Sequence, residues 1–284
     1  MNRREESGVD RAEAGREPGV GRLGGGRGAD PVEADRSAGP VGVGRDADPV
    51  EVEARRAELA ANLADVRRRI ERACAAVGRD PAEVALLAVT KTFPARDVAL
   101  LSDLGLTGFA ENRDQEAGPK VAAFAELRPG AAARWHMVGS LQRNKARSVV
   151  RWADRVDSVD SERLADALAK AAPAPLDVLV QVSVDGDPKR GGCPLPELPR
   201  LADHVARKDE LVLRGVMTVA PLGMSPAQAF DALQGAVTRL HVDHPDASVI
   251  SAGMSGDLED AIACGSTCVR VGTALLGSRR LASP

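Results

Sequence analysis

The stretch SAGMSGDLEDAIACGSTCVRVGTALLG, residues 251–277, predicts two short strands that each end in glycine and are separated by one helix. The turn 253–256 follows the first strand, and Gly272 and Thr273 follow the second. Backbone N–H groups at such turns and at the start of a helix lack intrahelical partners and attract anions. An isolated glycine-rich turn more often only reverses the chain, but two in tandem favour a phosphate site.

Upstream of this stretch, short apolar runs alternate with amphipathic helical segments. The eight candidate strands are 84–89, 108–110, 135–138, 155–159, 178–184, 213–219, 248–251 and 268–271. The helices expected between them are 95–104, 114–127, 144–152, 161–171, 196–206, 226–242 and 257–264. Such an alternation requires a parallel sheet, and eight units close into an α/β fold, a single (β/α)₈ TIM barrel. An open doubly wound sheet is the second-ranked alternative.

The segment before the first strand divides into a tail and a helix. The first 50 residues hold 11 of the 28 glycines and carry 8 Arg against 10 acidic residues. Such a composition buries too little apolar surface to offset its ordering entropy. We therefore expect a disordered low-complexity tail over 1–50 and one barrel domain over 51–284; a start codon placed too far upstream would leave the same pattern. An extra N-terminal helix is expected over 52–77, with these apolar residues at helical spacing: Leu59, Leu63, Val66, Ile70 and Ala73.

The composition of the remaining chain excludes several classes of protein. It has 30 basic and 31 acidic side chains, which is no electrostatic footprint for nucleic acid or an acidic membrane. It also lacks an apolar run long enough for a signal peptide or a membrane anchor, so we expect a cytoplasmic protein. Cys74, Cys193, Cys264 and Cys268 form no metal or redox motif, and we expect neither a metal site nor a disulfide framework.

Polar residues follow several of the predicted strands, at the rim where a barrel of this kind carries its chemistry. Lys91 follows the first strand, and its amine is expected in the mouth of the barrel. Partial shielding from water lowers the pKa of an amine and makes it nucleophilic toward carbonyls. A lysine at a strand end often only extends into water. Together with a phosphate site, however, Lys91 favours a phosphorylated carbonyl compound as ligand, and pyridoxal 5'-phosphate (PLP) fits that description.

Five sequence blocks carry a resemblance to a known family. They are AVTK at 88–91, EN at 111–112, WHMVGSLQRNK at 135–145, GMSGD at 253–257 and VRVGT at 269–273. With these blocks the chain resembles the YggS/PROSC family of PLP homeostasis proteins from about residue 59 to residue 279. The resemblance implies a barrel of the PLP fold-type III kind, related to the N-terminal domain of alanine racemases.

The resemblance also implies a set of cofactor-binding residues. Lys91 would form the Schiff base with PLP, and Asn112 would line the cofactor face. The phosphate would be held by Ser255, Gly272 and Thr273. Arg270 would face the pyridine nitrogen, where its fixed charge keeps that nitrogen unprotonated and weakens the ring as an electron sink. The alternative for Arg270 is a structural ion pair with Glu111 or Asp257.

Three positions depart from the family pattern. Ala110 stands where glycine is usual, Leu276 where an aromatic residue is common, and Ser183 where asparagine is usual. The added methyl group of Ala110 is the most informative departure, since it would press on the cofactor or its loop.

The chain contains no tyrosine, whereas the two-base mechanism of the alanine-racemase type uses a tyrosine as its second base. We also expect no second domain after residue 284 to supply a base. The favoured function is a non-catalytic PLP carrier in intracellular PLP (vitamin B6) homeostasis, a monomer or weak homodimer with apo PLP-dependent enzymes as recipients. Two alternatives remain open: a PLP-dependent amino-acid racemase or related enzyme with an unrecognised second base, and a Schiff-base aldolase acting on a sugar phosphate.

Overall fold

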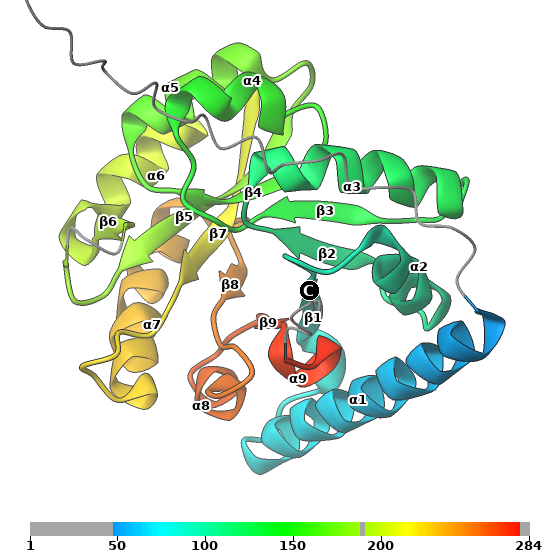
Figure 1. Ribbon diagram of the computed structural model, residues 1–284. Coiled ribbons are helices and arrows are strands. Elements are labelled where there is room, and N and C mark those ends of the chain that lie inside the picture. Colours follow the sequence, from blue (N-terminus) through cyan, green and yellow to red (C-terminus); the bar gives the residue numbers. More distant parts are fainter. Residues whose placement is uncertain (1–47, 188–190, 279–284) are drawn as a thin grey trace, which may run out of the picture. The chain divides into compact units, whose positions relative to one another are not determined.

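The computed structural model describes residues 48–187 and 191–278. The predicted tail lies outside the described residues up to position 47, and its last two predicted residues, Pro49 and Val50, belong instead to the first helix. Among the described residues, eight strands pair in parallel in a closed ring, in which β9 pairs with β1 and β4 pairs with β5 (Figure 1). A short β6, Cys193–Pro194, pairs with β5. The closed ring confirms the predicted barrel and overturns the open sheet. Its strands are β1 Ala85–Val89, β2 Gly108–Glu111, β3 Arg134–Met137, β4 Arg155–Val159, β5 Leu176–Ser183, β7 Leu211–Thr218, β8 Val249–Ser251 and β9 Cys268–Val271.

Helices surround the ring on its outer side (Figure 1). The first, α1, begins at Pro49, because the Asp48 side chain accepts a hydrogen bond from Val50 N at 2.9 Å and proline suits the first turn of a helix. The predicted helix 144–152 is instead a 3-10 turn, Arg143–Lys145, followed by the single-turn α4. The α-helices are α1 Pro49–Ala76, α2 Ala95–Asp103, α3 Asp114–Leu127, α4 Ala146–Val149, α5 Glu162–Ala171, α6 Leu198–Ala206, α7 Pro226–Asp243, α8 Leu258–Ala263 and α9 Thr273–Leu276.

Helix α1 belongs to the core of the barrel domain. Its five predicted apolar residues are all buried, as the helical spacing required. They share one apolar cluster with Leu258 and Ile262 of α8 and with Leu275 and Leu276 of α9. Burial of several large aliphatic side chains, each contributing on the order of 1.5–3 kcal/mol, fixes α1 against these two short helices.

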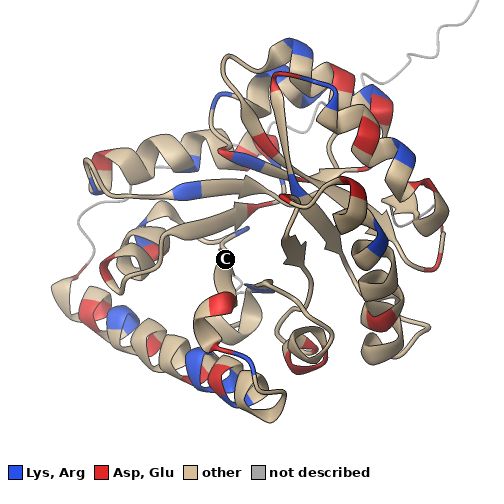
Figure 2. Ribbon diagram, turned by 180° about the vertical axis from the view of Figure 1, so that it is seen from behind, with Lys and Arg blue, Asp and Glu red and all other residues tan. Residues whose placement is uncertain are grey.

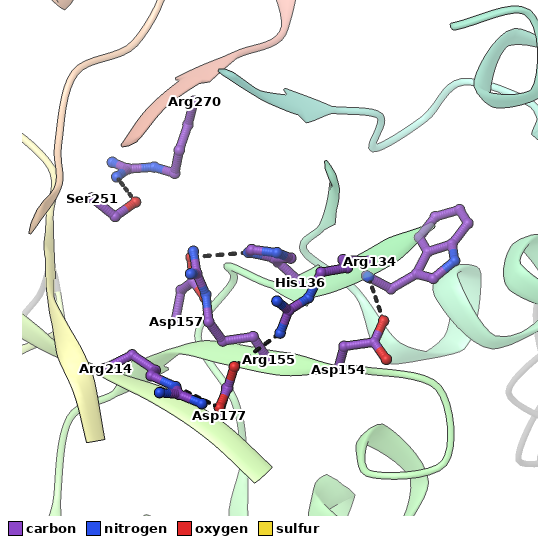
Figure 3. Close-up of polar contacts among 10 residues, drawn as sticks. Arg134, His136, Asp154, Arg155, Asp157, Asp177, Arg214, Ser251 and Arg270 are labelled. Carbon is purple, nitrogen blue, oxygen red and sulfur yellow. Dashed lines mark hydrogen bonds and ion pairs between the residues drawn. The ribbon is translucent and has the colours of Figure 1, made fainter. Parts of the chain in front are cut away.

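The interior of the ring carries charged residues that the sequence analysis did not predict (Figure 3). Arg155 Nε donates to Asp157 Oδ1 at 2.7 Å, and His136 Nδ1 lies 3.5 Å from Asp157 Oδ2. Arg155 also interacts with Cys268 of β9, and since β4 and β9 are not neighbours in the ring, this interaction crosses the interior. Burial alone would raise the pKa of Asp157, but His136 and Arg155 outweigh burial and lower it.

A second ion cluster lies at the opposite end of the ring from the strand ends that carry the predicted site. Arg134 of β3 and Arg214 of β7 both donate to Asp177 of β5, at 2.9 and 2.7 Å (Figure 3). All three residues lie near the beginnings of their strands. The carboxylate therefore ties three strands together at the amino-terminal end of the barrel.

One glycine is required by the packing of two neighbouring strands. Gly215 of β7 has φ 146°, and a Cβ atom there would lie 1.9 Å from the carbonyl oxygen of Val249 in β8. The pairing of β5 with β7 also shifts register between Val178 and Leu179, the residues opposite this part of β7. The backbones of β7 and β8 thus approach too closely for a side chain at position 215.

We expect Gly215→Ala to lower the free energy of unfolding by about 3 kcal/mol or more, because both the φ angle and the clash oppose a methyl group. Urea unfolding followed by circular dichroism measures the change. Gly235→Ala is the matched control, since Gly235 lies exposed in α7 with nothing within 4 Å of its Cβ position. The control should stabilise by about 0.5–1 kcal/mol; a Gly215→Ala protein as stable as the wild type would contradict the packing described.

The lowered pKa of Asp157 predicts a pH-dependent contribution to stability. A carboxyl group with a lowered folded-state pKa stabilises the protein above its unfolded pKa, and this stabilisation disappears as the pH falls through the folded value. Asp157→Asn should therefore destabilise the protein at neutral pH and progressively less below the ordinary pKa of 3.8. Urea unfolding of both proteins from about pH 7 to pH 3 measures the difference. If the difference in the free energy of unfolding between the two proteins stays constant over this range, the pKa of Asp157 is not lowered in the folded protein.

Candidate functional site

The carboxyl-terminal ends of β1, β2 and β9 meet at one rim of the barrel. Val89 of β1 pairs with Ala110 of β2, and Ala88 pairs with Val271 of β9. Lys91, Asn112, Gly272 and Thr273 each follow one of these strand ends by one or two residues. The register of the sheet thus brings these four predicted site residues to the same rim, from positions up to 182 residues apart in the chain.

Lys91 lies in a turn with an unusual backbone. Thr90 before it is fully buried, whereas Lys91 itself is exposed. The structure therefore gives no support for the predicted shielding of the amine from water. Thr92 has φ 68°, and a β-branched residue in this region stores on the order of 1–3 kcal/mol of strain. Such strain is characteristic of functional turns, which agrees with the position of Lys91 at the rim.

The two glycine loops, residues 253–257 after β8 and 272–274 after β9, are in direct contact. Ser255 Oγ accepts a hydrogen bond from Ala274 N at 3.2 Å. Gly253 has φ 88°, and a Cβ atom there would lie 2.6 Å from Ala261 Cβ, so this turn requires glycine. The three residues predicted to hold phosphate, Ser255, Gly272 and Thr273, are therefore brought together by the fold.

One expected donor of the first glycine loop is used inside the loop. Met254 N donates to Asp257 Oδ1 at 2.5 Å, and Asp257 N donates to Met254 O at 3.3 Å. The loop is closed by its own aspartate. The start of α8 consequently offers fewer free N–H groups than the sequence predicted, and the hydroxyl of Ser255 gains importance.

Arg270 of β9 is buried, and its guanidinium points toward Ser251 of β8 (Figure 3). Its Nη1 donates to Ser251 Oγ at 2.8 Å and its Nη2 to the carbonyl oxygen of Thr218 at 2.6 Å. The side chain is buried, and burial lowers the pKa of its guanidinium. Both hydrogen-bond partners are neutral, so the predicted alternative of an ion pair with Glu111 or Asp257 is wrong.

Glu111 is paired with a residue that the sequence analysis did not identify. Its Oε1 accepts from Lys120 Nζ and from Thr90 Oγ1, each at 2.6 Å, and Lys120 Nζ also donates to Thr90 O at 2.9 Å. Both charged side chains are buried, with Glu111 fully enclosed. Glu111 Oε2 is a buried oxygen without a hydrogen-bond partner among the described residues. This buried ion pair holds the residue that immediately precedes Lys91.

Three further residues noted in the sequence, His136, Ala110 and Asn112, pack against neighbouring parts of the barrel. His136 is buried, and its Nδ1 lies 3.5 Å from Asp157 Oδ2. Ala110 packs with Leu87 and Cys268 in an apolar cluster, which accommodates its methyl group. Asn112 is half-buried, and its carbonyl oxygen lies 2.2 Å from the Cβ position of Gly139, so the turns after β2 and β3 are closely packed.

The described part of the chain has neither a metal-binding cluster nor a membrane-spanning helix. No group of three or more His, Cys, Asp or Glu residues there is arranged to hold a metal ion. Within the same residues, no helix combines the length and the apolar character that a membrane span requires. The four cysteines are free, and burial raises the pKa of Cys193 to about 12, so its thiol is unreactive at neutral pH.

The fold and rim define the class of protein. Residues 57–280 match the family described as "Alanine racemase, N-terminal domain". Alanine racemase from Corynebacterium glutamicum is 14% identical with a TM-score of 0.60, over 81% of this chain and 62% of that one, and it shows the fold alone. The molecule is thus a closed parallel barrel of the alanine racemase N-terminal type.

Closer relatives carry a more specific name. The pyridoxal phosphate homeostasis protein of Mycobacterium leprae is 46% identical over 247 residues, covering 81% of this chain and 96% of the relative. That of Escherichia coli K12 is 41% identical over 228 residues, covering 78% and 97%. PipY of Synechococcus elongatus PCC7942, solved with PLP bound, is 32% identical with a TM-score of 0.67, covering 77% and 100%. The chain belongs to the pyridoxal phosphate homeostasis protein family, and the resemblance to YggS/PROSC proteins is confirmed.

The buried pair at the rim yields a stability prediction. Lys120→Met should lower the free energy of unfolding by about 3–5 kcal/mol, because it leaves the Glu111 carboxylate buried without its cation. The double variant Glu111→Gln with Lys120→Met should recover much of that loss, since no charge remains unpaired. Urea unfolding of the wild type, of Lys120→Met and of the double variant measures these free energies.

Lys170→Met is the matched control, because Lys170 is exposed at the end of α5. It should change the free energy of unfolding by no more than about 0.5 kcal/mol. A double variant as unstable as Lys120→Met alone would show that the loss does not come from an uncompensated charge.

Proposed function

We propose that this chain binds PLP at the rim of the barrel and serves PLP homeostasis without catalysing a reaction of its own. The observation that carries the proposal is the meeting of Lys91, the two glycine loops and the buried Arg270 at one end of the ring. Family membership and the PLP bound to PipY support the choice of ligand.

The residues present fit the chemical groups of PLP. Lys91 would hold the aldehyde, with its Nζ bonding to the aldehyde carbon as the carbonyl oxygen leaves as water. Ser255 Oγ and the backbone N–H groups of Gly272 and Thr273 would hold the phosphate. Asn112 would line the face of the ring. When bound, PLP supplies an aldehyde for reversible attachment and a ring that withdraws electrons.

Arg270 would limit what the bound cofactor can do. Its guanidinium stays charged even when burial lowers its pKa, since the ordinary value lies far above neutrality. A positive charge beside the pyridine nitrogen would disfavour protonation of that nitrogen and so weaken the ring as an electron sink. The neutral partners Ser251 and Thr218 orient Arg270 without cancelling its charge.

The sequence contains no tyrosine, so this chain cannot supply the tyrosine that acts as the second base in the alanine-racemase mechanism. This supports a non-catalytic role. We further propose that the protein acts in the cytoplasm, as a monomer or weak homodimer, with apo PLP-dependent enzymes as the recipients of its cofactor. The alternative is a PLP-dependent amino-acid racemase that uses another residue as its second base, and a racemisation assay distinguishes the two.

We expect the purified protein to develop a visible absorbance band with added PLP, and borohydride to bleach that band. Reduction should leave a pyridoxyl group on the peptide that contains Lys91, which mass spectrometry of the digested protein locates. Lys91→Ala should lose this modified peptide and bind PLP more weakly, whereas Lys170→Ala, on the exposed end of α5, should behave as the wild type.

Three outcomes would overturn parts of the proposal. If the wild type forms no band, PLP is not the ligand, and a sugar phosphate trapped by borohydride would indicate the aldolase instead. If reduction labels only other lysines, the role of Lys91 is wrong. If the PLP-loaded protein racemises an amino acid and Lys91→Ala does not, the protein is an enzyme.

A further inference from the structure

We propose that α1 holds both glycine loops in their phosphate-binding geometry, with Arg69 and Asn62 as positioning residues. This inference rests on the proposed function, because it concerns how firmly the phosphate of PLP is held. Neither residue belongs to the rim, and neither is one of the residues expected to contact the cofactor. Their role follows from the contacts that α1 makes with the two loops from outside the barrel.

Arg69 bridges α1 to the first glycine loop. Its Nη1 donates to the carbonyl oxygen of Ser255 at 2.9 Å, while Nε and Nη2 donate to Glu259 Oε1 and Oε2 at 2.7 and 2.8 Å. The guanidinium is planar and rigid, so these bonds fix the position of Ser255 relative to the first turn of α8. The same serine presents its hydroxyl to the second loop.

Asn62 and Arg55 connect α1 to the second loop through α9. Asn62 Nδ2 donates to the carbonyl oxygen of Leu275 at 3.0 Å, and Arg55 Nη2 donates to that of Leu276 at 3.0 Å. Helix α9 has only four residues and begins at Thr273, directly after Gly272. A displacement of its last residues therefore moves the proposed phosphate donors of Gly272 and Thr273 as well.

The apolar face of α1 makes these polar contacts act together. Leu59, Leu63 and Val66 share one buried cluster with residues of α8 and α9. Figure 1 shows α1 running beside α9 toward α8, and Figure 2 shows acidic and basic residues interspersed along the length of α1. One helix thus supports both loops, and the Ser255 to Ala274 hydrogen bond joins the loops to each other.

Preorganised donors contribute to binding because the ligand does not have to order them. Loosening α1 should therefore weaken the hold on the phosphate. It should leave the attachment to Lys91 unchanged, because Lys91 follows β1, whose end is fixed by the sheet and by Glu111 and Lys120. Pyridoxal, which has the aldehyde and the ring of PLP but no phosphate, separates the two effects.

The test compares the affinities of Arg69→Met and Asn62→Leu proteins for PLP and for pyridoxal. Each variant should bind PLP about tenfold more weakly, the change expected for loss of one strong hydrogen bond. Pyridoxal affinity should stay within about twofold of the wild type. Without ligand, amide hydrogen exchange of residues 253–257 should accelerate in Arg69→Met. Arg68→Met, an exposed position whose ion pair with Asp65 lies within α1, is the matched control and should change none of these quantities.

Each outcome decides one question. Equal losses of PLP and pyridoxal affinity would show that α1 only stabilises the fold and would overturn the inference, as would unchanged PLP affinity in both variants. If Arg69→Met does not fold, Asn62→Leu carries the same comparison on the other loop. Failure of the wild type to bind PLP would instead refute the proposed function, because that result does not depend on α1.

Discussion

The pairing of β1 with β9 is the contact on which the rest of the structure depends. Four registered residue pairs, from Ala85 with Cys268 to Ala88 with Val271, close the ring between the first and last strands. Closure brings Lys91 and Gly272 to one rim although they are far apart in sequence, and it encloses Arg270 between β1 and β8. An open sheet with the same eight strands would leave these residues at opposite edges. Closure thus joins the Lys91 side of the candidate site to the two glycine loops, which the neighbouring strands β8 and β9 bring together locally.

The barrel interior tolerates charges because they have ionic or hydrogen-bonding partners. Moving a charged side chain out of water costs on the order of several kcal/mol, unless opposite charges or hydrogen bonds compensate for the lost hydration. Inside the ring, Asp157 has Arg155 and His136, and between the ring and α3, Glu111 has Lys120. Arg270 differs, since its side-chain hydrogen-bond partners among the described residues are neutral. The negative charges of Asp157 and Asp257 favour its charged form without contacting it, and under the proposed function that charge faces the cofactor ring.

The sequence allowed the framework to be predicted well, because local signals determine it. The bounds of β4, β9 and α3 were predicted without error, and the buried face of α1 followed from the spacing of five residues. Pairing between distant side chains has no such signal. Lys120 lies within a helix, and nothing in its neighbourhood indicates Glu111 as its partner; Glu111 was instead considered as a partner of Arg270. The exposure of Lys91 and the contacts of Arg69 likewise depend on how separate elements meet in space.

The two halves of the proposed cofactor site are supported by different parts of the molecule. Lys91 is carried by the strained turn after β1, which is held by the sheet and by the Glu111 to Lys120 pair between β2 and α3. The glycine loops are held from outside, through the hydrogen bonds of α1. A carrier must bind its cofactor firmly and still release it, and release of a Schiff base by hydrolysis requires that water reach it. The exposed position of Lys91 meets that requirement, so retention would depend mainly on the phosphate and on the loops that α1 supports. In this arrangement, the firmness of binding and the rate of covalent exchange can change independently.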